Sequence, residues 1–229
     1  MIQSDKFDSL NMNVKKIVNI TLIFIAKRLT EIFGFLILFA GIFLFVSLVS
    51  YSPEDPNFIF PENTEIRNLL GFRGSYISDI FFQSIGLVSY LISLTLIFTG
   101  INIILKKDFF LIIENIFYSI LYSIFGSIFL NYFYNTTFAL FINGNGGFIG
   151  NYLNENFFEN LLSLNENISY YFLIILTISL FLLSVDFSPK KFFNFLKKIN
   201  FLNPKSNKNY TDKSEVINEY IPQEEIKNL

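Results

Sequence analysis

The chain has 229 residues, of which 52% are apolar and 19% aromatic, and its formal net charge at pH 7 is −2. It contains neither cysteine nor histidine, which excludes a disulfide framework, a zinc ribbon, a thiol nucleophile and any histidine-based acid–base or metal site. The apolar residues gather in a few long runs, so one water-soluble core is not the expected architecture.

Four runs without a charged residue mark the predicted membrane spans. These runs are 32–49, 80–105, 116–133 and 168–185. About 20 apolar residues in a helix cross the roughly 30 Å hydrocarbon layer, and a helix satisfies its own backbone in lipid. A charge at mid-bilayer costs about 2.5–3.5 kcal/mol, so charge-free runs are selected there. The sequence therefore predicts an all-α membrane protein with four transmembrane helices, at about 31–50, 79–105, 112–134 and 168–186.

Residues 1–28 are predicted to be a cytoplasmic or interfacial lead-in to the first span. Their apolar run, 17–26, is too short to cross a bilayer. Lys27 and Arg28 follow it and no small-residue cleavage site is present, which argues against a signal peptide. Continuity of the lead-in with the first helix stays open.

The distribution of Lys and Arg predicts the orientation. Of the 17 such residues, only Arg67 and Arg73 lie in the loop 51–78, and the loop 135–167 has none. The other fifteen flank the opposite ends of the spans. By the positive-inside rule, both termini and the turn at 106–108 are cytoplasmic, and the two long loops face outward.

The short turn at 106–108 predicts that the second and third spans form an antiparallel hairpin. Small residues are expected to form its packing seam, because they let helix backbones approach closely in lipid. The candidates are Gly86, Ser89, Ser93 and Gly100 in the second span, and Ser119, Ser123, Gly126 and Ser127 in the third. The alternative is that these serines only bond back to their own helices.

After the fourth span, residues 188–202 are predicted to form a basic amphipathic juxtamembrane helix that begins at Ser188 and Pro189. The alternative is a cytoplasmic continuation of the fourth helix. Residues 203–229 are polar and mixed in charge, and they are predicted to begin a disordered linker.

The glycine-rich tract 144–150 invites comparison with a phosphate-binding loop. Its spacing fails the dinucleotide fingerprint, no strand is expected before it, and no glycine in the chain is followed by lysine. A flexible outer turn is the expected structure.

Acidic residues give no sign of catalysis. Glu31, Asp79, Glu114 and Asp186 lie at span ends, where acids usually serve as helix caps or dipole partners. The middle of each span lacks an ionisable residue, and the spans lack proline, which disfavours a secondary transporter. No catalytic residue, metal site or cofactor is predicted.

The first outer loop contains more residues that restrict or require particular backbone conformations than a simple connection between spans needs. Pro53 and Pro56 force an extended exit from the first span, and Gly71 and Gly74 permit backbone geometry closed to other residues. Asp79 is expected to cap the second span or to pair with the nearby arginine at position 73.

This loop resembles the N-terminal membrane domain of the FtsK/SpoIIIE DNA translocases. The family pattern is S-Y/F-x-P-x-D-P, followed by N-L-x-G-x-x-G-x-x-x-x-D-x-x-x-x-x-x-G. Its positions are here Ser50, Pro53, Asp55, Pro56, Asn68, Leu69, Gly71, Gly74, Asp79 and Gly86. The glycines at 146, 147 and 150 are similar to the family's second outer loop, and the resemblance covers roughly residues 28–190.

The resemblance implies a membrane anchor and interaction domain for a cell-division and chromosome-partition motor. Such a domain is expected in the bacterial inner membrane, at the division septum, as a homo-oligomer in contact with the lipid bilayer and other division proteins. DNA would be contacted only through an ATP-driven motor, which this sequence lacks. The chain is therefore expected not to be an enzyme, and to be either an incomplete translocase or a partner of a separate motor.

Two other functions stay open. A small four-helix transporter or channel component would use polar residues inside the bundle, for which Gln83, Asn102 and Asn131 are the candidates. A membrane sensor with two outer loops needs no particular motif.

Overall fold

The computed structural model describes residues 2–56, 65–135, 140 and 143–190. The chain separates into two compact units, Met1–Phe187 and Ser188–Leu229, and all the helices described below belong to the first. Of the second unit only residues 188–190 are described, so most of the predicted juxtamembrane helix and the whole predicted linker lie outside the described residues.

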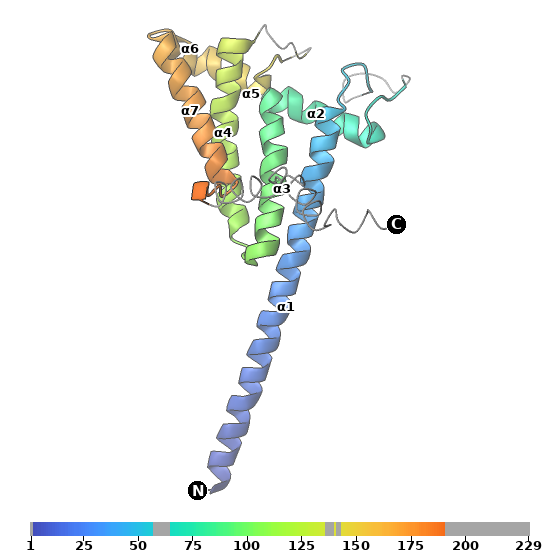
Figure 1. Cartoon of the computed structure of the whole chain (residues 1–229), viewed down its shortest axis with the longest axis vertical. Coiled ribbons are helices and arrows are strands. Elements are labelled where there is room, and N and C mark those ends of the chain that lie inside the picture. Colours follow the sequence, from blue (N-terminus) through green and yellow to red (C-terminus); the bar gives the residue numbers. More distant parts are fainter. Residues whose placement is uncertain (1, 57–64, 136–139, 141–142, 191–229) are drawn as a thin grey trace, which may run out of the picture. The chain divides into compact units, whose positions relative to one another are not determined.

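The described residues form an all-helical membrane domain, as predicted (Figure 1). Four helical runs are long and apolar enough to cross a membrane: Lys15–Val49, Gly71–Lys106, Leu111–Tyr134 and Glu166–Ser184. The third and fourth runs are the helices α4 and α7, whose ends lie within two residues of the predicted spans.

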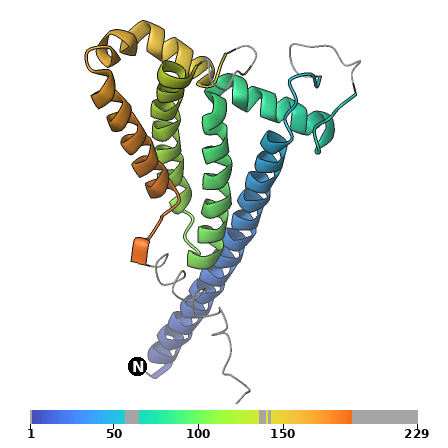
Figure 2. The ribbon, with the colours of Figure 1, turned by 45° about the horizontal axis from the view of Figure 1, so that its top comes forward.

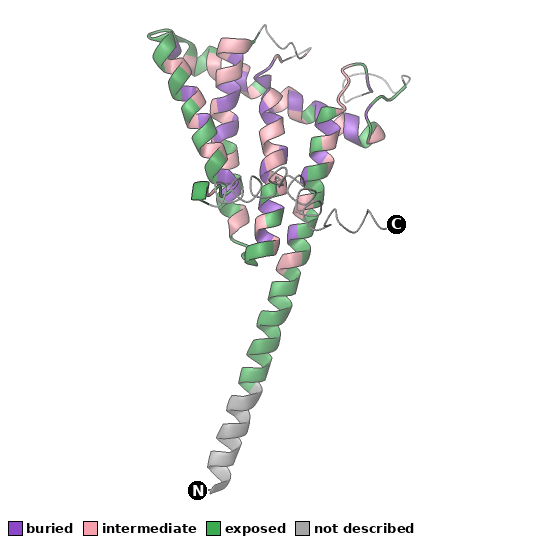
Figure 3. Cartoon of the chain, in the orientation of Figure 1, coloured by how far each residue is buried: buried purple, intermediate pink, exposed green. Residues whose placement is uncertain are grey.

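The first helix, α1, runs without interruption from Ile2 to Val49. The predicted lead-in is therefore helical and continuous with the first span. Figure 3 shows that the N-terminal half of α1 is exposed where its burial is described, whereas the C-terminal half packs within the bundle.

The second span differs from the single helix predicted at 79–105. The structure has α2, Gly71–Ile85, a short 3-10 turn η1, Gly86–Val88, and α3, Ser89–Lys106. The break falls at Gly86, whose backbone angles of φ 63° and ψ −144° are available essentially only to glycine. As a result α2 turns away from α3 and lies across one end of the bundle (Figure 2).

The helices α1 and α3 are in close backbone contact, which was not predicted. A Cβ atom on Gly41 of α1 would lie 2.7 Å from the Ile97 nitrogen, and one on Gly100 of α3 would lie 2.6 Å from the Leu38 nitrogen. Gly34 is equally confined. Glycine thus permits backbone contact between α1 and α3, as in other membrane helix pairs.

The hairpin of α3 and α4 is held instead by larger polar groups. Asn115 Nδ2 donates to Thr99 Oγ1 at 2.8 Å, and the Tyr122 and Thr95 hydroxyls lie 2.9 Å apart. The candidate serines at 89, 93, 123 and 127 are buried and the one at 119 is partly buried. Four of these hydroxyls, all except that of Ser127, donate to backbone carbonyls three or four residues earlier in the chain.

The segment predicted as a flexible outer turn is ordered. Its residues 147–150 begin the helix α5, Gly147–Leu153, which is followed by a π-helical turn η2, Asn154–Phe158, and by the helix α6, Glu159–Leu162. Figures 1 and 2 show α5 and α6 at the same end of the bundle as α2. We call this end, formed by α2, α5 and α6, the capped end.

Two small apolar clusters support the capped end. One joins Leu44 and Leu48 of α1 to Phe82 of α2. The other joins Ile128 of α4, Leu162 of α6 and Leu173 of α7. The helices that cross the end of the bundle are therefore anchored to the spans by buried side chains.

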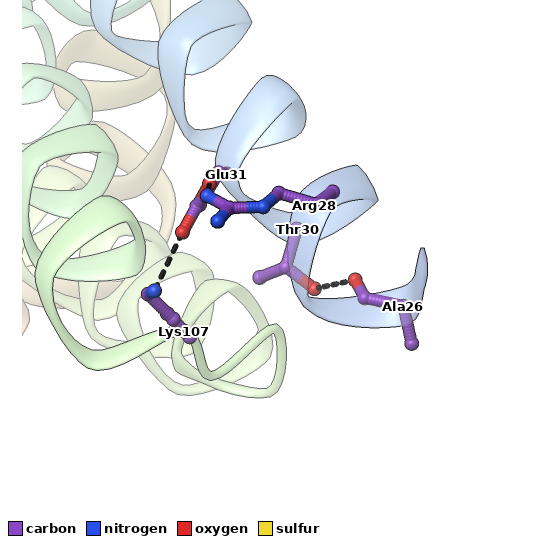
Figure 4. A network of polar contacts seen from close by, with 5 residues as sticks. All are labelled: Ala26, Arg28, Thr30, Glu31 and Lys107. Atoms are coloured by element: carbon purple, nitrogen blue, oxygen red, sulfur yellow. Dashed lines mark hydrogen bonds and ion pairs between the residues drawn. The ribbon is translucent and has the colours of Figure 1, made fainter. Parts of the chain in front are cut away.

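The opposite end carries Lys106 and Lys107, and we call it the basic end. Lys107 adopts a left-handed φ of 56° in the turn after α3, and its ammonium lies 2.7 Å from Glu31, which also pairs with Arg28 at 2.5 Å (Figure 4). Lys106 pairs with Asp186. Glu31 and Asp186 therefore link separate helices and are not the simple caps that were predicted.

Candidate functional site: the capped end of the bundle

Asp55 closes the first loop. Its carboxylate is 1% exposed and accepts hydrogen bonds from the backbone nitrogens of Arg67 and Asn68, both at 2.8 Å. Pro56 is fully buried, and its carbonyl accepts a hydrogen bond from the Ser75 hydroxyl at 2.9 Å. Arg67 and Asn68 follow Asp55 by twelve and thirteen positions, so its carboxylate brings the two ends of the loop together.

Asn68 caps the end of α1. The last carbonyls of a helix lack partners within it, and Asn68 Nδ2 donates to two of them, Ser47 O at 2.9 Å and Ser50 O at 3.2 Å. Its Oδ1 accepts from the Leu70 nitrogen at 3.0 Å. The side chain therefore fixes the end of α1 relative to the start of α2.

The two motif glycines of α2 have different roles. Gly71 has φ +63° with open space around its Cα, so only its backbone angle requires glycine. A Cβ on Gly74 would collide with the Asn68 side chain, and the Gly74 carbonyl accepts a hydrogen bond from the Ser47 hydroxyl. Gly74 is therefore a close-contact position between α2 and α1.

Asp79 lies in the middle of α2 and is 3% exposed. The Tyr51 hydroxyl donates to its Oδ1 at 3.3 Å and Gln83 Nε2 donates to the same atom at 3.4 Å. Asp79 is thus an acceptor within the cap, which corrects its predicted role as an N-cap of the second span. Burial, and then the Asp79 carboxylate beside it, raises the pKa of Tyr51 to about 12, so Tyr51 stays a donor at neutral pH.

The two long loops between the spans interlock at two glycines. The Leu87 nitrogen donates to the Asn145 carbonyl at 2.9 Å. Gly86 and Gly147 have positive φ, and a Cβ on either would overlap the backbone of the other loop. Gly150 is similarly confined against the backbone of α4. The glycines at 146, 147 and 150 therefore allow close backbone packing.

A chain of side-chain amides continues this contact. Asn143 Nδ2 donates to Gln83 Oε1 at 3.0 Å, and Asn151 Nδ2 donates to the Asn143 carbonyl at 3.2 Å. Asn131 of α4 donates to Asn151 and accepts from Asn154 at 2.9 Å. Through Gln83 these amides connect to the buried carboxylate of α2, so the first and second loops share one polar network. Asn131 is buried, and the other amide side chains of this network are partly buried.

Two aromatic groups are displayed on this rigid scaffold. The loop-1 patch consists of Leu69, Phe72 and Tyr76; Leu69 is 77% exposed, and the two rings stack with centroids 6.1 Å apart. The loop-2 patch consists of the exposed residues Phe148, Tyr152 and Phe157, with successive ring centroids 5.9 and 6.4 Å apart. Exposed apolar patches on fixed elements are typical of interaction sites.

The structure brings the predicted loop residues together. Pro53 leads from the end of α1 into the segment where Asp55 and Pro56 are buried, and Gly74 and Asp79 contact the same region from α2. Gly86 belongs to the neighbouring contact with the second loop. The hydrogen bonds of Tyr51 and Asn145 were not predicted, and Gly147 was predicted only as a position of the family pattern and not as a contact with the first loop.

Among the described residues, no group of three or more His, Cys, Asp or Glu side chains is arranged to hold a metal ion.

Four spans beneath an interlocked cap define a polytopic membrane domain with a structured face. The family model for the "4TM region of DNA translocase FtsK/SpoIIIE" matches residues 26–198, and the chain belongs to this family. It is similar to the DNA translocase FtsK of Azospirillum brasilense, with 34% identity over 87 residues, and to that of Rickettsia typhi, with 32% identity over 69 residues. No solved structure matches the chain.

The alignments cover only part of each protein. They include 37% and 30% of this chain, and 14% and 9% of the two relatives. The similarity to these two relatives is therefore limited to a small part of their length, and the matching family model describes the membrane region of such translocases.

Proposed function

We propose that this chain is a membrane anchor and interaction domain of a DNA translocase that acts in cell division and chromosome partition. It holds the translocase in the bacterial inner membrane at the division septum as a homo-oligomer, and it contacts other septal membrane proteins through the capped end. DNA is engaged by the ATP-driven motor of the translocase and not by this membrane domain.

The observation that carries this proposal is the interlocked cap. A mere connector between spans needs no buried carboxylate, no asparagine cap and no backbone contact between loops. Here the Asp55 clamp, the Asn68 cap and the contact of Gly86 with Gly147 hold the described ends of both loops against the helices. Rigid support for exposed aromatic residues favours recognition of another protein, since less conformational entropy is lost on binding.

The positions of the polar residues disfavour the transporter or channel alternative. Gln83 and Asn131 belong to the amide network of the capped end. Asn102 donates to the Val185 carbonyl at 3.1 Å, near the basic end. These side chains therefore do not converge on one site within the bundle, as a solute pathway would require.

Localisation tests the proposal. A fluorescent protein fused after Leu229 is expected to concentrate at midcell in a dividing rod-shaped bacterium. The double change Phe72→Ser and Tyr76→Ser removes both aromatic rings of the loop-1 patch, and it is expected to reduce midcell enrichment severalfold while leaving the protein in the membrane. Phe35→Ser, on an exposed face of α1, is the matched control for loss of a surface aromatic.

A uniform envelope signal from the unaltered fusion, at an expression level where a resident septal protein still concentrates at midcell, would contradict the septal role. Equal midcell enrichment of the unaltered and the loop-1 variant fusions would instead remove the loop-1 patch from the interaction surface.

A further inference from the structure

The helix α1 carries an apolar stripe with coiled-coil spacing. Its residues alternate between steps of four and three positions and are all 47–65% exposed. They are Val18, Leu22, Ile25, Leu29, Ile32, Leu36 and Phe39. This is a heptad pattern sustained over three heptads, which is typical of a helix that pairs with another helix along a left-handed supercoil.

The stripe faces away from the bundle. Residues two apart in a helix are separated by about 200° around its axis. Gly34, which contacts α3, is therefore opposite Ile32 and Leu36, and Gly41 is opposite Phe39. Figure 3 shows the exposed surface continuing along α1 toward its N-terminus. The stripe is thus available to a partner while α1 remains packed on α3.

The N-terminal part of the stripe extends past the expected hydrocarbon layer. Counting about 20 residues of hydrocarbon back from Val49 ends at residue 30, beside Glu31, which pairs with Lys107 at the basic end. Val18, Leu22 and Ile25 lie beyond this charged level. Apolar faces have little tendency to associate within lipid, but outside it the hydrophobic effect favours their burial.

A second copy of this chain is the partner that fits. Copies in one membrane share an orientation, so their α1 helices meet in parallel and in register. The stripe then has Leu22, Leu29 and Leu36 at the a positions, with Ile25 and Ile32 at d positions. Leucine at a with isoleucine at d favours assemblies larger than dimers.

The charges beside the stripe are compatible with this packing. Arg28 occupies a g position next to the seam, where copies would bring like charges together. Its guanidinium is paired at 2.5 Å with Glu31 of the same helix, which reduces that repulsion. We propose that the α1 stripe is the self-association seam of the protein, a parallel coiled coil of more than two α1 helices that extends past the membrane on the basic side. This inference rests on the homo-oligomeric anchor proposed above and assigns its contact.

Cysteine cross-linking tests the seam, because the full chain contains no cysteine. Single changes Leu22→Cys, Ile25→Cys and Leu29→Cys place thiols at a and d positions, and Ile20→Cys, Ile23→Cys and Phe24→Cys are controls on other faces of the same helix. A disulfide requires Cα atoms within about 7 Å, so copper-catalysed oxidation in membranes is expected to give at least fivefold more cross-linked product at the seam positions.

Dilution with excess lipid separates contact from collision. Cross-linking at the seam is expected to persist on dilution, and the double change Leu22→Glu and Leu29→Glu is expected to reduce the mass of the particle in light scattering. Equal cross-linking at all six positions would overturn the proposed seam. Absence of cross-linking at every position would also overturn it, and this is the result expected if lipid covers the stripe. If the particle remains oligomeric while the seam fails, the homo-oligomeric anchor stands; a monomeric particle removes both.

Discussion

Removal of the Asp55 carboxylate should destabilise the capped end strongly. The carboxylate accepts two hydrogen bonds of 2.8 Å from backbone N–H groups and is 1% exposed. Hydrogen bonds to a charged group contribute about 1.5–3 kcal/mol each, so Asp55→Ala is expected to cost about 3–6 kcal/mol. Asp55→Asn keeps one acceptor oxygen but places a side-chain N–H group against a backbone N–H group. It is therefore expected to cost at least half as much free energy as Asp55→Ala.

The neighbouring acid is the matched control. Glu54 pairs with Arg67 at 2.9 Å, but the two side chains are 70% and 67% exposed, and such pairs contribute about 0–1 kcal/mol. The assay is thermal unfolding of the purified chain in mild detergent, followed by circular dichroism. At about 2–4 °C per kcal/mol for a chain of this size, Asp55→Ala should lower Tm by at least about 6 °C and Glu54→Ala by less than about 4 °C. Equal shifts for the two variants would refute the Asp55 clamp.

Three further predictions follow from the contacts. Gly86→Ala should lower Tm much more than Gly71→Ala does. Gly71→Ala costs only about 1–2 kcal/mol of backbone strain, whereas Gly86→Ala adds a clash with the backbone of the second loop. Equal decreases in Tm in the same unfolding assay would argue against the interlocked loops. Gly41→Leu should separate α1 from α3 and sharply reduce detergent resistance, whereas Ala40→Leu, on the exposed side of α1, should not; indistinguishable variants would contradict the close helix contact. The pKa of Tyr51 is raised to about 12 from 10, so the stabilising contribution of its hydroxyl is present below pH 10 and is lost as the pH rises through 12. In a pH titration followed by phenolate absorbance, Tyr51→Phe should therefore lack one group that titrates late. Loss of a group that titrates near pH 10 would contradict the burial of this hydroxyl.

The spans were predictable because the hydrocarbon layer constrains sequence so strongly. Charge is excluded over about 20 residues at a time, and the ends of α4 and α7 follow directly from that exclusion. The break at Gly86 was not predictable from the same signal, since both α2 and α3 are apolar and the break depends on one glycine's backbone angles. The α1–α3 contact was missed because Gly100 fitted the hairpin seam equally well by spacing.

The candidate site was located by its motif, but the roles of its residues were not. Prolines and glycines indicated an ordered loop, and Asp55 and Gly74 are indeed buried in it. Their partners, including the amide of Asn68, come from distant positions, and hydrogen-bond partners leave no periodic pattern in sequence. The asparagine network was hidden for another reason: asparagine is frequent throughout this chain, so its occurrence at Asn131 and Asn151 carried no distinguishing signal.

We expect this membrane domain to anchor and position a DNA translocase motor. A chimera tests it directly: residues 1–198 of this chain replace the corresponding membrane region of a full-length family member in a bacterium that depends on that protein for chromosome partition. The measurement is the fraction of dividing cells with DNA trapped at the septum. The account predicts that the chimera concentrates at midcell and restores partition, and that the Asp55→Ala form does so less well. A chimera that is inserted and abundant, but distributed evenly and unable to reduce trapped DNA, would contradict it.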